Sequence, residues 1–249
     1  MRRSFADPRE TYETNVLGTV NVLEAVREAG DVEVVINVTS DKCYENREWE
    51  WAYREDEPLG GHDPYSSSKA CAELVTAAYR RSFGTRVASA RAGNVFGGGD
   101  WAQDRLVPDL MRAADAGAPL RLRNPDSVRP WQHVLNPLSG YLMLAERAFG
   151  DETFADAWNF GPPDDDARSV RWIAERLGAT WEHDAGEHPH EARALKIDSS
   201  RARERLGWRP RWPLDEGLAR TAEWHSALRA GEDMRAVSLA QIEAYAAAS

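Results

Sequence analysis

Two short stretches decide how the sequence folds: Thr39-Ser40-Asp41-Lys42-Cys43-Tyr44 and Pro64-Tyr65-Ser66-Ser67-Ser68-Lys69. The first follows the apolar run 32–38, which is typical of a parallel strand buried on both faces. The second begins with a proline, which suits the first turn of a helix. A strand that ends in polar residues and leads to a helix favours an open α/β sheet, in which ligands bind at the carboxyl ends of the strands.

Tyr65 and Lys69 are four residues apart at the start of the expected helix, so both side chains lie on one face. A lysine beside a tyrosine favours the phenolate and lowers the tyrosine pKa from its usual value of about 10. Such a tyrosine can exchange a proton with a sugar or alcohol hydroxyl near neutral pH. Tyr-x-x-x-Lys is common by chance, so an ordinary exposed helix pair is the alternative. The preceding strand and the Asp41-Lys42 pair favour the catalytic interpretation.

Strands and helices alternate up to residue 90, which favours a parallel sheet. The pattern predicts helices at 10–29 and 64–83 and strands at 32–38 and 87–90. Beyond residue 90 the elements become irregular, which indicates a smaller second lobe. The further helices are expected at 106–116, 137–149, 169–177, 199–206 and 214–228, and a further strand at 157–160.

Composition narrows the class of protein. The 249 residues carry a formal net charge of -10, which argues against a nucleic-acid or anionic-membrane partner. No apolar run approaches the roughly 20 residues that span a bilayer, and we expect a cytoplasmic location. Cys43 and Cys71 give neither a disulfide framework nor metal spacing. The run 164–166 of three aspartates suits a solvated loop, and His183, His188 and His190 lack zinc-site framing, so no metal is predicted.

Several motifs occur along the chain: Thr11–Thr19, Thr39–Tyr44, Pro64–Lys69, Gly93-Asn94-Val95, Arg129–Val134 and Leu206–Pro210. Together they resemble the extended short-chain dehydrogenase/reductase family, in its nucleotide-sugar branch. The resemblance covers essentially the whole chain, and the combination of motifs is highly specific for the superfamily. Within the branch, Ser40-Asp41-Lys42 and Gly98-Gly99-Asp100-Trp101 are similar to the CDP-glucose 4,6-dehydratase group.

The resemblance implies an α/β fold with a partial Rossmann-like parallel sheet and a smaller C-terminal α/β substrate lobe. Residues 1–92, with 134–161, would be the remainder of the NAD-binding domain, and 93–133 with 162–249 the substrate-binding lobe. The family's first strand and glycine-rich turn do not occur before Tyr65, so on the order of 90–100 residues look absent. We expect either a truncated form or a true start upstream of Met1, and favour the second because the sheet would otherwise expose an apolar edge.

The resemblance also implies roles in an NAD-dependent 4,6-dehydration of a CDP-linked glucose. Tyr65 would take the proton of the carbon-4 hydroxyl, which Ser40 holds, and Lys69 would tune Tyr65 and contact the nicotinamide ribose. Asp41 would be the acid and Lys42 the base of the elimination, a role that needs a lysine pKa well below 10.4. A plain surface ion pair is the alternative for Asp41 and Lys42.

Other residues are predicted to bind the ligands. Asn15 resembles the family's helix asparagine and is expected, with Tyr65 and Lys69, on the NAD side. On the substrate side, Arg129 is a candidate for the pyrophosphate, because a guanidinium fork matches phosphate oxygens. Asn94, Arg105 and His133 are further candidates. Ordinary loop or helix-end hydrogen bonding is the alternative for each of these residues.

Two other functions remain open from the sequence. One is another nucleotide-sugar 4,6-dehydratase or a 4-epimerase of the same fold, and an epimerase would need Tyr65 and Lys69 but not the acid–base pair at Asp41 and Lys42. The other is a catalytically inactive remnant that lacks the NAD-binding glycine loop. A homodimer or homotetramer is expected in either case.

Overall fold

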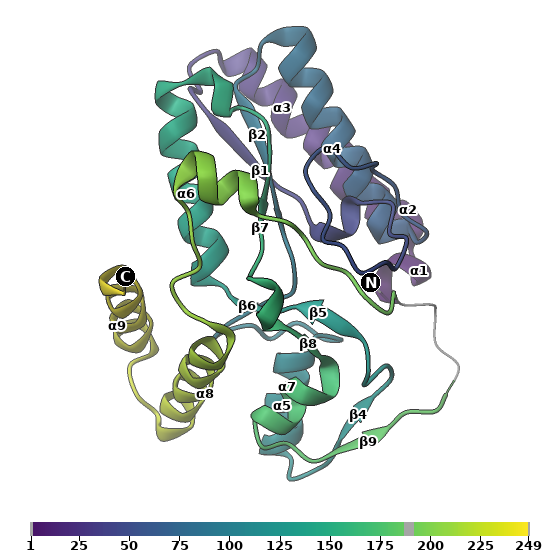
Figure 1. The fold of residues 1–249 in the computed structure, drawn as a ribbon, viewed down its shortest axis with the longest axis vertical. Coiled ribbons are helices and arrows are strands. Elements are labelled where there is room, and N and C mark those ends of the chain that lie inside the picture. The colour runs from purple at the N-terminus through teal and green to yellow at the C-terminus, as the bar shows by residue number, and fades with distance from the viewer. Residues whose placement is uncertain (1, 187–191, 249) are drawn as a thin grey trace. The chain divides into compact units, whose positions relative to one another are not determined.

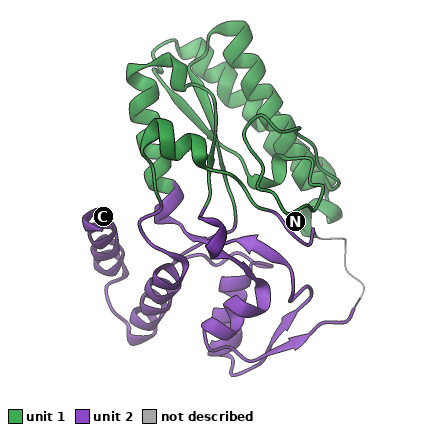
Figure 2. Ribbon diagram, in the orientation of Figure 1, with its two compact units in different colours: residues 1–93, 138–161, 196–209 green, residues 94–137, 162–195, 210–249 purple. Residues whose placement is uncertain are grey.

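The computed structural model describes residues 2–186 and 192–248. The chain divides into two compact units, which Figure 2 distinguishes by colour. Unit 1 comprises residues 1–93, 138–161 and 196–209, and unit 2 comprises residues 94–137, 162–195 and 210–249. The segment 196–209, expected in the second lobe, belongs to unit 1. No helix among the described residues is long and apolar enough to cross a membrane.

Unit 1 is built on a three-stranded parallel sheet, as the alternation of strands and helices predicted. The strands run in the order β1-β2-β7, so β1 lies at an edge of the sheet (Figure 1). The register aligns residue 35 with residue 87 and residue 89 with residue 157. The strand bounds are Val35–Val38 for β1, Val87–Ala92 for β2 and Ala157–Phe160 for β7.

Two long helical segments pack together in unit 1. The predicted helix 10–29 is longer than expected and consists of α2 (Pro8–Tyr12), a π-helical segment (Glu13–Leu17) and α3 (Gly18–Ala29), preceded by α1 (Arg2–Ala6). It ends at Gly30, whose φ of 72° is in the left-handed region that favours glycine. The second segment is α4, Pro64–Phe83, as predicted.

The core of unit 1 lies between the sheet and α6 (Leu135–Gly150). Trp158, Phe160 and Trp208 are buried there with Leu144. Residue 140 is a glycine for a steric reason, because a Cβ at this position would lie 2.3 Å from the Phe160 ring. The segment 196–209 joins this unit because its π-helix, Ala202–Leu206, contributes Ala202 and Leu206 to the same core. A short 3-10 helix, Glu152–Phe154, precedes β7.

The described residues of unit 2 form three two-stranded ladders and a core of their own. Two ladders are parallel, β3 (Val95–Phe96) with β6 (Gln132–His133) and β4 (Leu120–Leu122) with β9 (Trp181–His183). The third is antiparallel, β5 (Val128–Pro130) with β8 (Ala167–Ser169). The helices of unit 2 are α5 (Leu106–Asp115), α7 (Val170–Arg176), α8 (Leu214–Ala230), α9 (Met234–Ala247) and the 3-10 turn Asp164–Asp166.

Candidate active site

The turn after β1 is the first part of the site. Ser40 has an extended backbone and begins a 3-10 turn, Asp41–Cys43. Its Oγ accepts a hydrogen bond from the backbone N–H of Lys42 at 3.2 Å and donates one to Asp41 Oδ1 at 3.1 Å. Ser40 and Asp41 are buried, whereas Lys42 is half-buried. The polar residues are therefore fixed in a tight turn at the carboxyl end of a parallel strand.

The start of α4 is the second part of the site. Asp63 caps the helix, because its Oδ1 accepts from the backbone N–H groups of Tyr65 at 2.9 Å and Ser66 at 3.0 Å. Tyr65 and Lys69 follow on consecutive turns of this helix, and both are half-buried. Helix α4 packs against the Asp41–Cys43 turn, so both predicted catalytic stretches meet within unit 1.

Burial lowers the pKa of Lys69, and the nearby Glu73 carboxylate opposes this effect. Desolvation disfavours the charged ammonium, so Lys69 loses its proton more readily than an exposed lysine does. A lysine of this kind is well suited to influence a neighbouring phenol, since its charge is poorly screened by water.

Asn15 is tied to the same helix turn. Its Nδ2 donates to Ser68 Oγ at 2.9 Å, and that hydroxyl donates to the carbonyl of Tyr65 at 2.7 Å. The predicted asparagine therefore supports the backbone that carries Tyr65. Tyr12 makes a second link, between its hydroxyl and that of Ser67.

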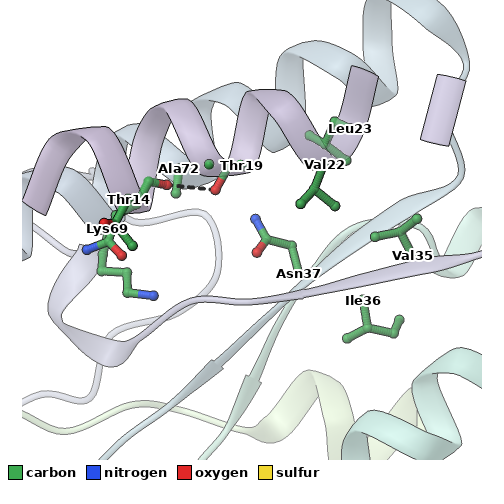
Figure 3. Close-up of a pocket in the computed structure, with 11 residues that line it drawn as sticks. Thr14, Thr19, Val22, Leu23, Val35, Ile36, Asn37, Lys69 and Ala72 are labelled. Carbon is green, nitrogen blue, oxygen red and sulfur yellow. Dashed lines mark hydrogen bonds between the residues drawn. The ribbon is translucent and has the colours of Figure 1, made fainter. Parts of the chain in front are cut away.

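A pocket of about 320 Å³ adjoins these residues inside unit 1. Figure 3 shows Thr14 and Lys69 at one end, and Val22, Leu23 and Val35 at the other. The pocket therefore has one polar end and one apolar end. Its remaining lining residues are Asn15, Gly18, Thr19, Ile36, Asn37 and Ala72.

A buried polar network, which no sequence motif indicates, lies against the Ser40-Asp41-Lys42 turn. Glu73 and Arg91 form an ion pair at 2.8 Å, with each side chain 3 % exposed. Glu73 also accepts hydrogen bonds from the hydroxyls of Thr39 and Ser89, and Arg91 donates to the Tyr44 hydroxyl. The sequence feature that could have indicated this network is the position of Glu73, one helical turn after Lys69 on the same helix face.

The predicted substrate residues all lie in unit 2. The Arg129 guanidinium is buried and donates to the backbone carbonyls of residues 128, 192 and 193. Arg105 is exposed and pairs with Asp100 at 3.1 Å. Asn94 is half-buried, and its backbone carbonyl accepts from the backbone N–H of Gln132 at 3.0 Å. Their roles toward substrate stay predictions.

His133 is buried among aromatic rings in unit 2. Its ring centroid lies 4.9 Å from that of Trp212 and 6.1 Å from that of Phe96. Burial lowers the pKa of His133 to about 4, so the imidazole is neutral at pH 7. A direct contact of His133 with substrate stays a prediction.

No group of three or more histidine, cysteine, aspartate or glutamate side chains suited to a metal ion occurs in the described parts of the chain. His188 and His190 lie outside the described residues. The aspartates of residues 164–166 form a 3-10 turn, with Asp166 Oδ2 accepting from the backbone N–H of Leu214 at 3.2 Å.

The sheet, the Tyr65–Lys69 helix and the polar turn define a Rossmann-like enzyme of the extended short-chain dehydrogenase/reductase type. Residues 1–161 match the sequence model of the NAD dependent epimerase/dehydratase family, and the chain belongs to this family.

Curated and solved relatives agree with this assignment. The chain is 51% identical over 265 aligned residues to CDP-glucose 4,6-dehydratase of Salmonella typhimurium, covering 100% of this chain and 74% of the relative. A structure of dTDP-glucose 4,6-dehydratase from Streptomyces venezuelae with NAD bound superposes with a TM-score of 0.81 at 28% identity, covering 93% of this chain and 71% of the other. UDP-glucose 4-epimerase of Thermotoga maritima, at 20% identity and a TM-score of 0.79, shares the fold over 92% of this chain and 74% of its own.

Proposed function

We propose that this chain catalyses the NAD-dependent dehydration of CDP-D-glucose to CDP-4-keto-6-deoxy-D-glucose. The observation that carries the proposal is the packing of α4, with Tyr65 and Lys69, against the turn that carries Asp41 and Lys42. The 51% identity to a CDP-glucose 4,6-dehydratase over the whole chain supports the choice of nucleotide and reaction.

The pocket in unit 1 is consistent with a nicotinamide cofactor. Its volume of about 320 Å³ is at the lower end for ligand sites, which suits one half of a dinucleotide. The amine of Lys69 and the polar groups of Thr14 and Asn15 would bind ribose hydroxyls, and the valine-rich end would accept an apolar ring face. NAD, when bound, accepts a hydride from the sugar and later returns it.

The first step needs a base for the carbon-4 hydroxyl. Tyr65 accepts this proton, and Ser40 turns its one hydroxyl hydrogen from Asp41 Oδ1 to the same sugar oxygen. Lys69 stabilises the Tyr65 phenolate by its charge. Oxidation at carbon 4 produces a ketone, which acidifies the proton on carbon 5.

The second step removes water across carbons 5 and 6. Lys42, in its neutral form, takes the proton from carbon 5, and Asp41, in its protonated form, protonates the departing carbon-6 hydroxyl. Asp41 is buried next to Lys42 in the same 3-10 turn, which supports this pairing of an acid with a base. Two adjacent groups with opposite tasks need environments that separate their pKa values.

The nucleotide and sugar would be held by residues of unit 2. We assign the substrate pyrophosphate to Arg129 and further substrate contacts to Asn94, Arg105 and His133. For Arg129 this requires its guanidinium to exchange at least one backbone carbonyl for a phosphate oxygen, which binds the cation more strongly.

The test is incubation of the protein and NAD with CDP-glucose, dTDP-glucose or UDP-glucose, followed by mass spectrometry of the sugar nucleotide. We expect loss of one water from CDP-glucose, with far slower loss from the other two. Turnover of another nucleotide sugar in preference would reassign the substrate, and an epimer of unchanged mass would make the protein a 4-epimerase. Thermal stabilisation by CDP alone, without turnover, would favour the inactive remnant.

We also propose a homodimer or homotetramer in the cytoplasm. Leu17 on the first helical segment of unit 1, and Leu74 and Phe83 on α4, are exposed large apolar side chains. Their exposure supports association through these helices. Light scattering of the purified protein measures the mass, and a monomer at micromolar concentration would contradict the proposal.

A further inference from the structure

The catalytic turn is held at both ends by one buried ion pair. Glu73 accepts a hydrogen bond from the Thr39 hydroxyl, immediately before Ser40. Arg91 donates to the Tyr44 hydroxyl at 2.7 Å, and its guanidinium carbon lies 4.9 Å from the Tyr44 ring centroid. Residues 40–43 lie between these two anchored side chains. The mechanism uses neither Glu73 nor Arg91.

The ion pair is itself firmly placed. Besides Thr39, Glu73 accepts from Ser89 Oγ at 2.7 Å and from Arg91 Nη2 at 2.8 Å. Burial would raise the pKa of Glu73, but the Arg91 hydrogen bond and charge hold it below its usual value. The carboxylate therefore stays charged, and charge-assisted hydrogen bonds of this kind are shorter and stronger than neutral ones.

The far end of the network is fixed to the sheet. The Tyr44 hydroxyl donates to Asn159 Oδ1 at 2.7 Å, and Asn159 lies on β7. Asn159 Nδ2 donates in turn to the carbonyls of Tyr53 at 2.9 Å and Asp198 at 3.0 Å. The network thus connects the catalytic turn to strands β2 and β7 and not only to its own strand.

A buried ion pair adds little to the stability of a fold, because desolvation of both charges offsets most of their attraction. The ion pair instead fixes geometry, because two charges in fixed positions orient every group that hydrogen-bonds to them. Glu73 also lies four residues after Lys69 on α4, so the same carboxylate acts on the catalytic lysine.

We propose that Glu73 and Arg91 are positioning residues, which act through Thr39 and Tyr44 to orient the Ser40-Asp41-Lys42 turn for the dehydration. This inference rests on the proposed function for its catalytic consequence. It assigns no direct contact with substrate or cofactor to either residue.

Two hydroxyls that bond to the same carboxylate provide a matched pair of variants. Thr39→Val removes the hydrogen bond from the catalytic turn, and Ser89→Ala removes the one from β2. Both side chains are buried, and each variant deletes one donor to Glu73. Only Thr39 adjoins the catalytic turn. A purely structural network predicts equal effects of the two variants, whereas positioning predicts different ones.

We expect Thr39→Val to lower kcat for CDP-glucose at least tenfold with little change in KM, since misplacement of reacting groups acts on the chemical step. Ser89→Ala should keep kcat within about twofold, and Thr39→Ser, which retains the hydroxyl, should restore it. Equal loss of kcat in Thr39→Val and Ser89→Ala, or an unchanged kcat in Thr39→Val, would overturn the proposal.

Hydrogen exchange of the same variants gives a second readout that needs no turnover. Positioning predicts faster amide exchange at residues 40–43 in Thr39→Val than in Ser89→Ala. Each variant is measured the same number of degrees below its own melting temperature. If exchange is faster in Thr39→Val but the wild-type protein does not dehydrate CDP-glucose, the proposed function is rejected and the positioning role remains supported. Unchanged exchange would reject the positioning role, whatever the substrate.

Discussion

Lys69 owes its chemical character to where it lies on α4. Its amine lines the pocket of unit 1, and burial lowers its pKa while Glu73, one turn away, partly restores it. When protonated, its ammonium acts on neighbouring groups in a poorly screened environment. Arginine would keep the charge, but its planar fork differs in shape from an ammonium.

The roles proposed for Tyr65 and Lys69 lead to two predictions. Tyr65→Phe should lower kcat by about 10²- to 10⁴-fold, the usual value of a positioned acid–base group. Lys69→Met should lower kcat and also weaken NAD binding, because its amine adjoins the pocket. Steady-state kinetics with CDP-glucose and calorimetric NAD titration measure both effects. Full turnover by Tyr65→Phe would remove this residue from the mechanism.

Lys42→Met tests the elimination separately from the oxidation. The variant should still oxidise carbon 4 but should not lose water, because the base for the carbon-5 proton is gone. Reduced cofactor would therefore accumulate on the enzyme, which its absorbance reports, while mass spectrometry finds no dehydrated product. Dehydration at the full rate would eliminate the base role of Lys42.

His133 makes stability depend on pH. Its pKa falls from about 6.5 in the unfolded chain to about 4 in the folded protein, so below pH 6.5 the unfolded state binds more protons. Stability should therefore fall as the pH drops through this window, by about 2 kcal/mol between pH 7.5 and 5. Urea unfolding of wild-type and His133→Gln at both pH values isolates this dependence, which the variant should lack. The exposed His62→Gln serves as control, and an equal slope in all three proteins would refute the assignment.

At the scale of the element, α4 depends on its first turn. Asp63 bonds two backbone N–H groups through Oδ1 and the Ser66 hydroxyl through Oδ2. Asp63→Ala should lower the free energy of unfolding by about 1 kcal/mol, with a range of about 0.5–2. It should also lower kcat, because Tyr65 lies in the uncapped turn. Chemical unfolding and kinetics test this, and Asp233→Ala, which removes a similar cap from α9, is the control for stability without catalysis.

Local sequence signals explain which elements could be predicted. Pro64 in the first turn predicted the start of α4, and the apolar run before Thr39 predicted β1, although the strand begins at Val35 instead of residue 32. The π-helical segment at Glu13–Leu17 has no periodic signal that differs from an α-helix. Helices and strands with local sequence signals could therefore be predicted. The switch from α-helical to π-helical hydrogen bonding could not.

At the scale of the whole molecule, the missed features are those that join distant parts of the chain. Glu73 and Arg91 are 18 residues apart, on a helix and a strand, and only the fold brings them together. The segment 196–209 joins unit 1 partly because Ile197 pairs with Tyr53 across more than 140 residues. The candidate catalytic residues were predicted because they follow a motif, whereas their supporting network follows none.

The position of β1 at the edge of its sheet has a consequence for solvent access. In the described part of the chain its hydrogen-bonding neighbour is β2, toward which the amides of Val35 and Thr39 point. Because successive backbone groups of a strand face opposite ways, the amides of Ile36 and Val38 face the outer edge, where Val38 is 48% exposed. These two amides should exchange deuterium much faster than their neighbours. An extended peptide that binds alongside β1 would slow the exchange of these two amides selectively. Deuterium labelling of residues 35–38, measured by mass spectrometry, would therefore detect the addition of a strand.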